Sequence, residues 1–371
     1  MKLKTKIPGK TLMNRRRFLS LTAAASAAAA APAVEQVTVW KAGEGGYFSY
    51  RIPALLATRK GTLLAFAEAR KNSRSDTGDI DMVVKRSEDQ GRTWSTQRVF
   101  ADQGANTIGN PCPVQDRSTS TIWMPLTGNP GNLAEREIEK NSERGTRTVW
   151  MTYSKDDGRT WATPYEITNT AKDAGWGWYA TGPGNGIQLR SGRLVIPCDH
   201  RRFAAQARHS HILYSDDHGK SWQLGGSAQP DTNECAVVEL NDGSLLLNMR
   251  SYAGRNRRAL ARSTDGGLTW TDTGFDEQLI EPVCQASLIR VDGRHLLFSN
   301  PASKKRERMT VRVSRDSAKT WSNGLVLHEG PAAYSSLAPL KGGWAGCLYE
   351  RGERSSYDTI TFARFRLASV G

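Results

Sequence analysis

The stretch Ser87-Glu88-Asp89-Gln90-Gly91-Arg92-Thr93-Trp94 decides the fold, because its pattern, S-x-D-x-G-x-[ST]-W, recurs along the chain. The Asp and Ser side chains of this box can hydrogen-bond nearby backbone amides, Gly supplies the open dihedral angles of a tight turn, and Trp adds a large apolar ring. The copies are residues 87–94, 154–161, 215–222, 263–270 and a degenerate copy, 314–321, in which Ala318 replaces Gly. Each copy therefore predicts a turn that closes a β-hairpin.

A second repeated signal is a turn followed by an apolar run, and β-like runs such as 148–153 precede the boxes. These turn signals lie at residues 60–64, 116–124, 191–195, 242–246, 292–297 and 341–344. Successive units are roughly 50 to 75 residues apart, which is enough for four short strands and their turns. The sequence therefore predicts an all-β fold, a six-bladed β-propeller. Its sixth unit ends at residues 357–365, and a strand near Val37–Trp40 is expected to pair there, because a propeller must protect its edges.

The first 33 residues have the pattern of an export signal rather than of a folded segment. Four lysines and Asn14-Arg15-Arg16-Arg17-Phe18-Leu19 precede an Ala-rich apolar run, and Ala31-Pro32-Ala33 offers a small-residue cleavage site. The pattern is typical of a twin-arginine signal, and its apolar run is shorter than the roughly 20 residues that span a bilayer. We therefore expect cleavage after Ala33 rather than a retained anchor, a periplasmic or secreted protein, and a single propeller domain over residues 34–371.

Charge and cysteine content narrow the classes of ligand. Removal of the first 33 residues takes away seven positive and no negative charges, so the net charge of the 371-residue chain falls from +14 to +7. This excess favours acidic ligands, but no long Lys/Arg run with interleaved aromatic residues indicates nucleic acid. The five cysteines are widely spaced without a C-x-x-C pair, which argues against zinc and against a dense disulfide framework, while one or two bridges stay open. We expect a monomer that binds an anionic small molecule.

Polar residues follow several of the apolar runs, where a propeller would bring them together. Such stretches are Glu68-Ala69-Arg70, Asn248-Met249-Arg250, Lys305-Arg306-Glu307-Arg308 and Leu348-Tyr349-Glu350. Equivalent positions of successive blades point towards one shared axis. We therefore expect these side chains to converge on the central mouth.

Together with the boxes, these stretches resemble the bacterial exo-sialidases over essentially the whole chain after residue 33. The resemblance is also carried by Tyr50-Arg51-Ile52-Pro53, Asn233-Glu234-Cys235-Ala236-Val237, Tyr334-Ser335-Ser336-Leu337 and Cys347-Leu348-Tyr349-Glu350. It implies a six-bladed propeller that removes terminal, non-reducing sialic acid from glycoproteins, glycolipids and oligosaccharides. It also implies that the configuration at the anomeric carbon is retained through a tyrosyl intermediate.

The substrate carboxylate explains the arginines of these motifs. Sialic acid carries a carboxylate on its anomeric carbon, which guanidinium groups can hold in forked geometry. The resemblance assigns this clamp to Arg51, Arg250 and Arg306, with Arg308 as the rival of Arg306. Clustered cations need a counter-ion, and Glu350 stands at the family's position for supporting Arg51.

The same carboxylate would repel a carboxylate nucleophile, whereas a neutral tyrosine avoids the repulsion, as the sialidases among glycosidases illustrate. Tyr334 is the candidate nucleophile, and Glu234 is the base that would take its proton. Asp76, in the polar loop after the first hairpin, is the expected general acid. Asp79 and Asp81 are its competitors in that loop.

Two further residues are predicted to contact the sugar. Arg70 would reach it from the first blade, and Tyr179 lies in segment 176–186, which resembles the family's pocket wall and otherwise would be a packed loop. Rings in such a wall offer an apolar surface for a methyl group. His209 and His211 share a strand face but lack a third ligand, so we expect no metal, and the reaction needs no cofactor.

Two other classes of protein compete with the enzyme. A sialic-acid-binding propeller lectin would keep the clamp without turnover, but it has no use for Tyr334 and its base. A scaffold protein without a sugar site leaves the arginine motifs unexplained. A transglycosylating or intramolecular variant would use the same residues as the hydrolase.

Overall fold

The computed structural model describes residues 1–5, 9, 34–138, 145–203, 205 and 207–371. Contacts within the chain separate two units, Met1–Pro32 and Ala33–Gly371. The predicted export segment, residues 1–33, lies almost entirely outside the described residues. Among the described residues no helix has the length and apolar character needed to cross a membrane.

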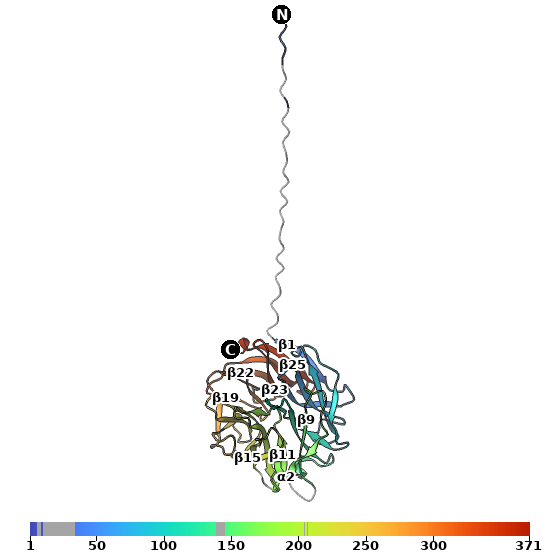
Figure 1. Ribbon diagram of the computed structural model, residues 1–371, viewed down its shortest axis with the longest axis vertical. Coiled ribbons are helices and arrows are strands. Elements are labelled where there is room, and N and C mark those ends of the chain that lie inside the picture. Colours follow the sequence, from blue (N-terminus) through green and yellow to red (C-terminus); the bar gives the residue numbers. More distant parts are fainter. Residues whose placement is uncertain (6–8, 10–33, 139–144, 204, 206) are drawn as a thin grey trace. The chain divides into compact units, whose positions relative to one another are not determined.

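Residues 34–371 are mostly β structure, arranged in four sheets (Figure 1). The first sheet contains, in order, β1 (Val34–Lys41), β25 (Thr359–Arg366), β24 (Trp344–Arg351), β23 (Leu325–Leu340), β22 (Glu307–Ser314), β21 (Leu296–Pro301) and β20 (Ser287–Arg290). The second contains β10 (Tyr165–Glu166), β9 (Thr148–Ser154), β8 (Ile122–Asn129), β6 (Thr107–Gly109), β4 (Ile80–Ser87), β3 (Leu63–Arg70) and β2 (Ser49–Ala57), with β5 (Arg98–Ala101) on β4 and β7 (Val114–Gln115) on β8.

The other two sheets are smaller and follow the chain order closely. The third contains β11 (Trp176–Thr181), β13 (Leu194–Arg202), β14 (Arg208–Ser215) and β15 (Gln223–Ser227), with β12 (Ile187–Gln188) on β13. The fourth is the antiparallel meander β16 (Thr232–Glu239), β17 (Leu245–Ser251), β18 (Arg257–Ser263) and β19 (Gly274–Ile280). Within the described part of the chain, helical structure comprises α1 (Glu135–Ile138), α2 (Thr168–Ala171) and a 3₁₀ turn, Leu367–Val370.

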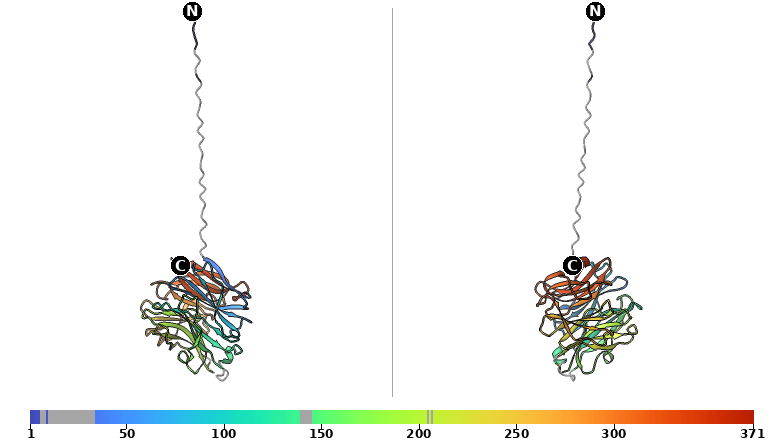
Figure 2. Two further views of the ribbon diagram at one scale, coloured as in Figure 1. Left: turned by 45° about the vertical axis from the view of Figure 1, so that its right-hand side comes forward. Right: turned by 90° about the vertical axis from the view of Figure 1, so that its left-hand side faces the viewer.

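The first and last strands of the β unit pair with each other, as the sequence predicts. β1 runs antiparallel to β25, from Val34 opposite Phe365 to Lys41 opposite Thr359. Figure 2 shows these two strands, blue and red, side by side in both views. Strands from opposite ends of the sequence therefore complete one sheet and protect its edge.

The boxes form the predicted hairpin turns. In the first box, the Ser87 hydroxyl donates to Asp89 Oδ1 over 2.7 Å and accepts the N–H of Gly91 over 2.8 Å, while Asp89 accepts the N–H of Thr93 over 3.0 Å. The other four boxes repeat these contacts. Gly91 has φ +87°, a left-handed conformation that favours glycine. Ala318 of the degenerate copy adopts φ +64° in the same place, so the turn survives the substitution.

Apolar side chains of neighbouring strands fill the interior, and the box tryptophans belong to it. Trp94 packs edge-to-face on Phe362 of β25 with ring centroids 5.4 Å apart, which links the first box to the last strand. All five cysteines are buried and free, so the one or two bridges that the sequence left open do not form. Each thiol acts as a small apolar residue in the core.

Candidate active site

A cavity of about 220 Å³ gathers most of the predicted site residues. Its lining comprises Arg51, Ile52, Glu68, Arg70, Asp76, Asn110, Glu135, Arg147, Trp178, Ala180, Asp199, Asn233, Glu234, Arg250, Tyr252, Arg306, Tyr334 and Tyr357. These residues come from strands of all four sheets, from helix α1 and from loops. Five arginines and five carboxylates therefore face one small space.

Three strands carry an irregular register at the residue that they contribute to this cavity. The pairing of β2 shifts between Arg51 and Ala54, that of β16 shifts on either side of Glu234, and that of β23 shifts on either side of Tyr334. A bulge of this kind redirects a side chain out of the regular alternation. Ile52, next to Arg51, also has φ +55°, a strained conformation for a β-branched residue.

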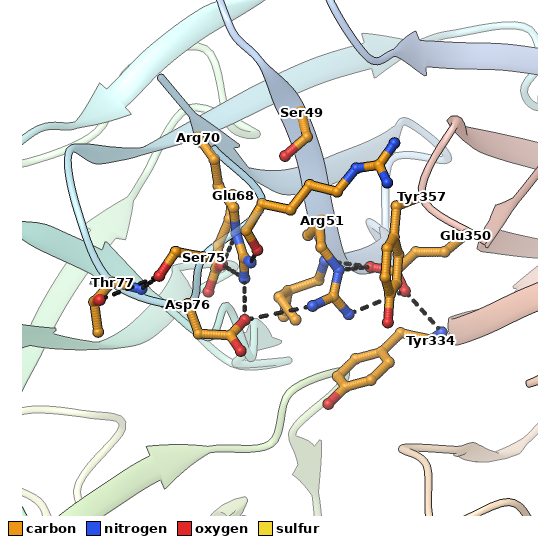
Figure 3. Close-up of polar contacts among 12 residues, drawn as sticks. Ser49, Arg51, Glu68, Arg70, Ser75, Asp76, Thr77, Tyr334, Glu350 and Tyr357 are labelled. Atoms are coloured by element: carbon orange, nitrogen blue, oxygen red, sulfur yellow. Dashed lines mark hydrogen bonds and ion pairs between the residues drawn. The ribbon is translucent and has the colours of Figure 1, made fainter. Parts of the chain in front are cut away.

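Glu350 fixes the position of Arg51 through hydrogen bonds to its guanidinium (Figure 3). Its carboxylate is fully buried and accepts two hydrogen bonds from the Arg51 guanidinium, from Nε over 3.1 Å and from Nη2 over 3.3 Å. It also accepts the backbone N–H groups of Ile52, over 2.9 Å, and Tyr334, over 3.1 Å. One carboxylate thus orients the predicted clamp arginine and the backbone of the predicted nucleophile, and it supports Arg51 rather than lining the cavity.

Tyr334, Glu234 and Arg250 form a hydrogen-bonded chain. The Tyr334 hydroxyl donates to Glu234 Oε1 over 2.5 Å, and Arg250 Nη1 donates to Glu234 Oε2 over 2.6 Å and to the Tyr334 oxygen over 3.3 Å. Burial and the adjacent Glu234 charge raise the pKa of Tyr334 well above its ordinary value. The phenol is therefore neutral at rest, with a base in place to receive its proton.

Arg306 lines the cavity, whereas its rival Arg308 does not. Arg306 Nη1 donates to the hydroxyl of Tyr357 over 2.8 Å, and the ring of Tyr357 lies 4.1 Å from the guanidinium carbon of Arg51. Arg308 instead makes an exposed ion pair with Glu329 at 3.5 Å. Tyr357 therefore braces two of the three predicted clamp arginines.

Asp76 is the acidic residue of its loop that reaches the cavity. Arg70 Nη2 lies 2.8 Å and Arg51 Nη1 lies 3.4 Å from Asp76 Oδ1. Partial desolvation opposes its charge, but Arg70 and Arg51 outweigh that effect and lower the pKa of Asp76. Asp79 and Asp81 are engaged elsewhere, both in ion pairs with Lys71.

The prediction of a substrate contact for Tyr179 needs correction. Its side chain is fully buried; the hydroxyl donates a hydrogen bond to the Cys198 sulfur over 3.3 Å, and the ring stacks near that of Trp176. On β11 the neighbouring Trp178 lines the cavity instead, beneath the guanidinium of Arg147 at 4.0 Å. Adjacent residues of a strand point to opposite faces. Trp178 therefore faces the cavity, while Tyr179 faces the core.

Asp199, Arg147 and Tyr357 line the cavity but were not among the residues that the sequence predicted. Asp199 follows the apolar run 194–198, so the signal that selected Arg70 and Arg250 could have found it. Burial and the charge of Glu234 raise the pKa of Asp199 well above its ordinary value, which favours a protonated carboxyl beside the base. Arg147 and Tyr357 stand in loops or at a strand start, where no repeat marks them.

Among the residues that the structure describes, no group of three His, Cys, Asp or Glu side chains is arranged to hold a metal. Of the two histidines that the sequence singled out, His209 is half-buried, with its Nδ1 3.0 Å from the carbonyl oxygen of Ala228. His211 is fully buried, and its Nδ1 lies 3.1 Å from that of His200.

Comparisons with known proteins agree on one family. Residues 61–347 match the family model described as a BNR repeat-like domain. The chain is 34% identical to a sialidase of Bacteroides fragilis over 90% of this chain and 65% of that protein, and 32% identical to an exo-alpha-sialidase of Aspergillus fumigatus over 88% and 86%. It also superimposes on the solved structure of Hadza microbial sialidase Hz136 with a TM-score of 0.84 and 34% identity, covering 91% of this chain and 69% of that one. The chain thus spans just under two thirds of the length of the Bacteroides relative.

Proposed function

This chain belongs to the sialidase family with BNR-type repeats, and from that premise we propose that it is a retaining exo-α-sialidase acting on terminal sialic acid of glycans. One observation carries the proposal. The Tyr334 hydroxyl donates over 2.5 Å to Glu234, and three arginines, Arg51, Arg250 and Arg306, line the same cavity. A phenol with its own base, beside clustered guanidinium groups, suits a substrate that carries a carboxylate on the reacting carbon.

In the first step, the three arginines hold the substrate carboxylate and place the anomeric carbon against Tyr334. The phenolic oxygen attacks that carbon while its proton moves to Glu234, and the bond to the aglycone oxygen breaks. Asp76 gives its proton to the leaving oxygen. Arg250, bound to Glu234 at 2.6 Å, keeps the base in place while its charge changes.

In the second step, Asp76 takes a proton from water, and the water oxygen attacks the anomeric carbon from the face that the aglycone left. The bond to Tyr334 breaks, and Glu234 returns the proton to the phenolate. Two inversions give net retention. Asp76 must be protonated to begin this cycle, and binding of the substrate carboxylate to Arg51 would withdraw one of the cations that lower its pKa.

Three wider features belong to the same proposal. Residues 34–371 would form one propeller domain of six antiparallel blades, with the pairing of β1 and β25 completing the last. Residues 1–33 would be a twin-arginine-type signal that is removed on export to the periplasm or the exterior. The exported protein would act as a monomer.

The test is release of a fluorescent aglycone from an α-sialoside by residues 34–371, with Tyr334→Phe and the matched control Tyr214→Phe, whose hydroxyl bonds only Gln223. We expect turnover by the wild type and by the control, and a loss of about a thousandfold or more in kcat for Tyr334→Phe. Proton NMR should show the α anomer of sialic acid first. A folded protein that binds free sialic acid without turnover would instead favour the lectin.

A variant and a matched control test the arginine clamp. Arg250→Ala is expected to lower kcat/KM by about a hundredfold or more, since it removes a charge that acts on the reacting centre. Arg308→Ala removes an arginine that lies outside the cavity and should leave kcat/KM unchanged. Equal losses in the two variants would contradict the assignment.

A further inference from the structure

A second, larger cavity lies at the other ends of the strands that build the first. It measures about 600 Å³. β2 contributes Arg51 to the first cavity and residues 55–57 to the second, and β23 contributes Tyr334 to the first and residues 337–339 to the second. Because a strand advances about 3.3 Å per residue, the two cavities are separated by roughly 10 Å or more along these strands.

Two polar residues, the buried Gln285 and the half-buried Asn185, tie the backbone together between the two cavities. Gln285 donates to the carbonyl oxygens of Pro183 and Ser335, and it accepts the N–H of Ser335. Asn185 donates to the carbonyl of Leu337 and accepts the hydroxyl of Ser336. The second cavity is therefore a separate site and not an extension of the substrate pocket.

The walls of the second cavity are largely apolar. Leu55, Val114, Val238, Ile289 and Leu337 are buried there. Leu56 and Ile187 are only half-buried and present apolar surface to the cavity. A concave site of this size that combines apolar walls with polar groups is typical of small-molecule binding.

Four arginines stand in the lining of this cavity, and their guanidinium groups are held by the main chain. Arg59 donates to the carbonyl of residue 117, and Arg117 donates to those of residues 188 and 189. Arg190 donates to the carbonyls of residues 240 and 241, and Arg290 donates to that of residue 239. Bonds to carbonyls fix these side chains without neutralising their charge.

The charge of the lining is unbalanced. Glu239, which pairs with Arg190 at 3.2 Å, is the one carboxylate among the residues described as lining the cavity. Partial burial and the nearby charge of Arg190 lower the pKa of Arg290, as expected where cations crowd together. Three positive charges therefore remain beside an apolar hollow, and an anion would relieve their repulsion.

We propose that this cavity binds a small amphiphilic organic anion, with its carboxylate, sulfate or phosphate group on the arginines and its apolar body against Leu56 and Ile187. Arginine is suited to such head groups because its planar donors bind oxyanions in pairs. The proposal is independent of the sialidase activity, since none of these residues lines the substrate cavity.

The experiment measures binding of 2-naphthalenesulfonate to residues 34–371 by isothermal titration calorimetry. Neutral 2-naphthalenemethanol and methanesulfonate test the apolar body and the anionic head alone. We expect the sulfonate to bind at least about tenfold more tightly than either, and more weakly as salt rises, because the arginines are partly exposed to solvent. Equal binding of the sulfonate and the neutral alcohol would overturn the proposal.

Substitutions in and outside the second cavity test where the sulfonate binds. Arg117→Gln and Arg190→Gln should each weaken sulfonate binding about three- to tenfold, and the control Arg255→Gln, an exposed arginine paired with Glu277, should not. Arg250→Ala, which alters the substrate cavity, should leave sulfonate binding intact. Circular dichroism checks that each variant is folded. Loss of sulfonate binding in Arg250→Ala, or unchanged binding in both Arg117→Gln and Arg190→Gln, would refute the second site.

Discussion

Replacing Glu350 by glutamine tests how the candidate active site is held together. The Glu350 carboxylate is fully buried and accepts four hydrogen bonds, two from Arg51 and one each from the N–H groups of Ile52 and Tyr334. Glutamine keeps the shape but only one acceptor oxygen, so it loses one charged and one backbone hydrogen bond and leaves Arg51 without its buried counter-ion. Breaking a buried pair in this way costs about 3–5 kcal/mol.

Glu350→Gln should lower the activity as well as the stability. Arg51 would no longer be fixed against the substrate carboxylate, and a misplacement of about 1 Å typically costs about a hundredfold in rate. We therefore expect Glu350→Gln to lower the free energy of unfolding by about 3–5 kcal/mol and kcat/KM by about a hundredfold. Equilibrium urea unfolding followed by tryptophan fluorescence gives the first quantity, and aglycone release gives the second.

An exposed carboxylate provides the matched control. Glu277 pairs with Arg255 and Arg257 at 3.2 and 3.4 Å, but its side chain is 65% exposed. Solvent screens such a pair, so Glu277→Gln should change the free energy of unfolding by no more than about 1 kcal/mol. If Glu350→Gln costs no more than this control, Glu350 is not the buried support that the geometry indicates.

The remaining predictions concern the general acid and the boxes. Asp76 must start protonated, so activity is lost as pH rises through its pKa. Replacing both Arg70 and its ion-pair partner Glu68 by glutamine removes a cation that lowers the pKa of Asp76. The alkaline limb of the kcat/KM profile should therefore move to higher pH. An unchanged limb would exclude Asp76 as the acid. Gly91→Ala should destabilise the protein by about 2–4 kcal/mol, because its Cβ would lie 2.0 Å from an aromatic carbon of β25 at φ +87°. Gly243 has the same φ, but no atom lies within 4 Å of its added Cβ, so Gly243→Ala should lower the free energy of unfolding in urea by only about 1 kcal/mol. Equal losses in the two variants would contradict the packing argument.

Much of the architecture follows from patterns of neighbouring residues, which can be recognised in the sequence. Each box sets its own turn, because Ser87 and Asp89 bond amides only a few residues away. The turn-and-strand repeat likewise predicts an all-β chain, and the pairing of the first and last strands follows from the need to cover an edge. Glu234 and Tyr334 could be named because short motifs surround them.

The tertiary structure decided what depends on contacts between distant segments. Arg306 rather than Arg308 enters the cavity; the pairing of β22 shifts on either side of Arg308, whose φ is +60°, and that side chain pairs with Glu329 instead. Trp178 rather than Tyr179 forms the wall, since strand alternation puts adjacent side chains on opposite faces and no local signal reveals which face is inward. Arg147, which precedes β9, and Asp199, on β13, enter the site from different parts of the fold, so only their meeting in space identifies them. A pattern along the chain determines turns and strand periodicity, but which side chains share a cavity is determined by how the sheets pack.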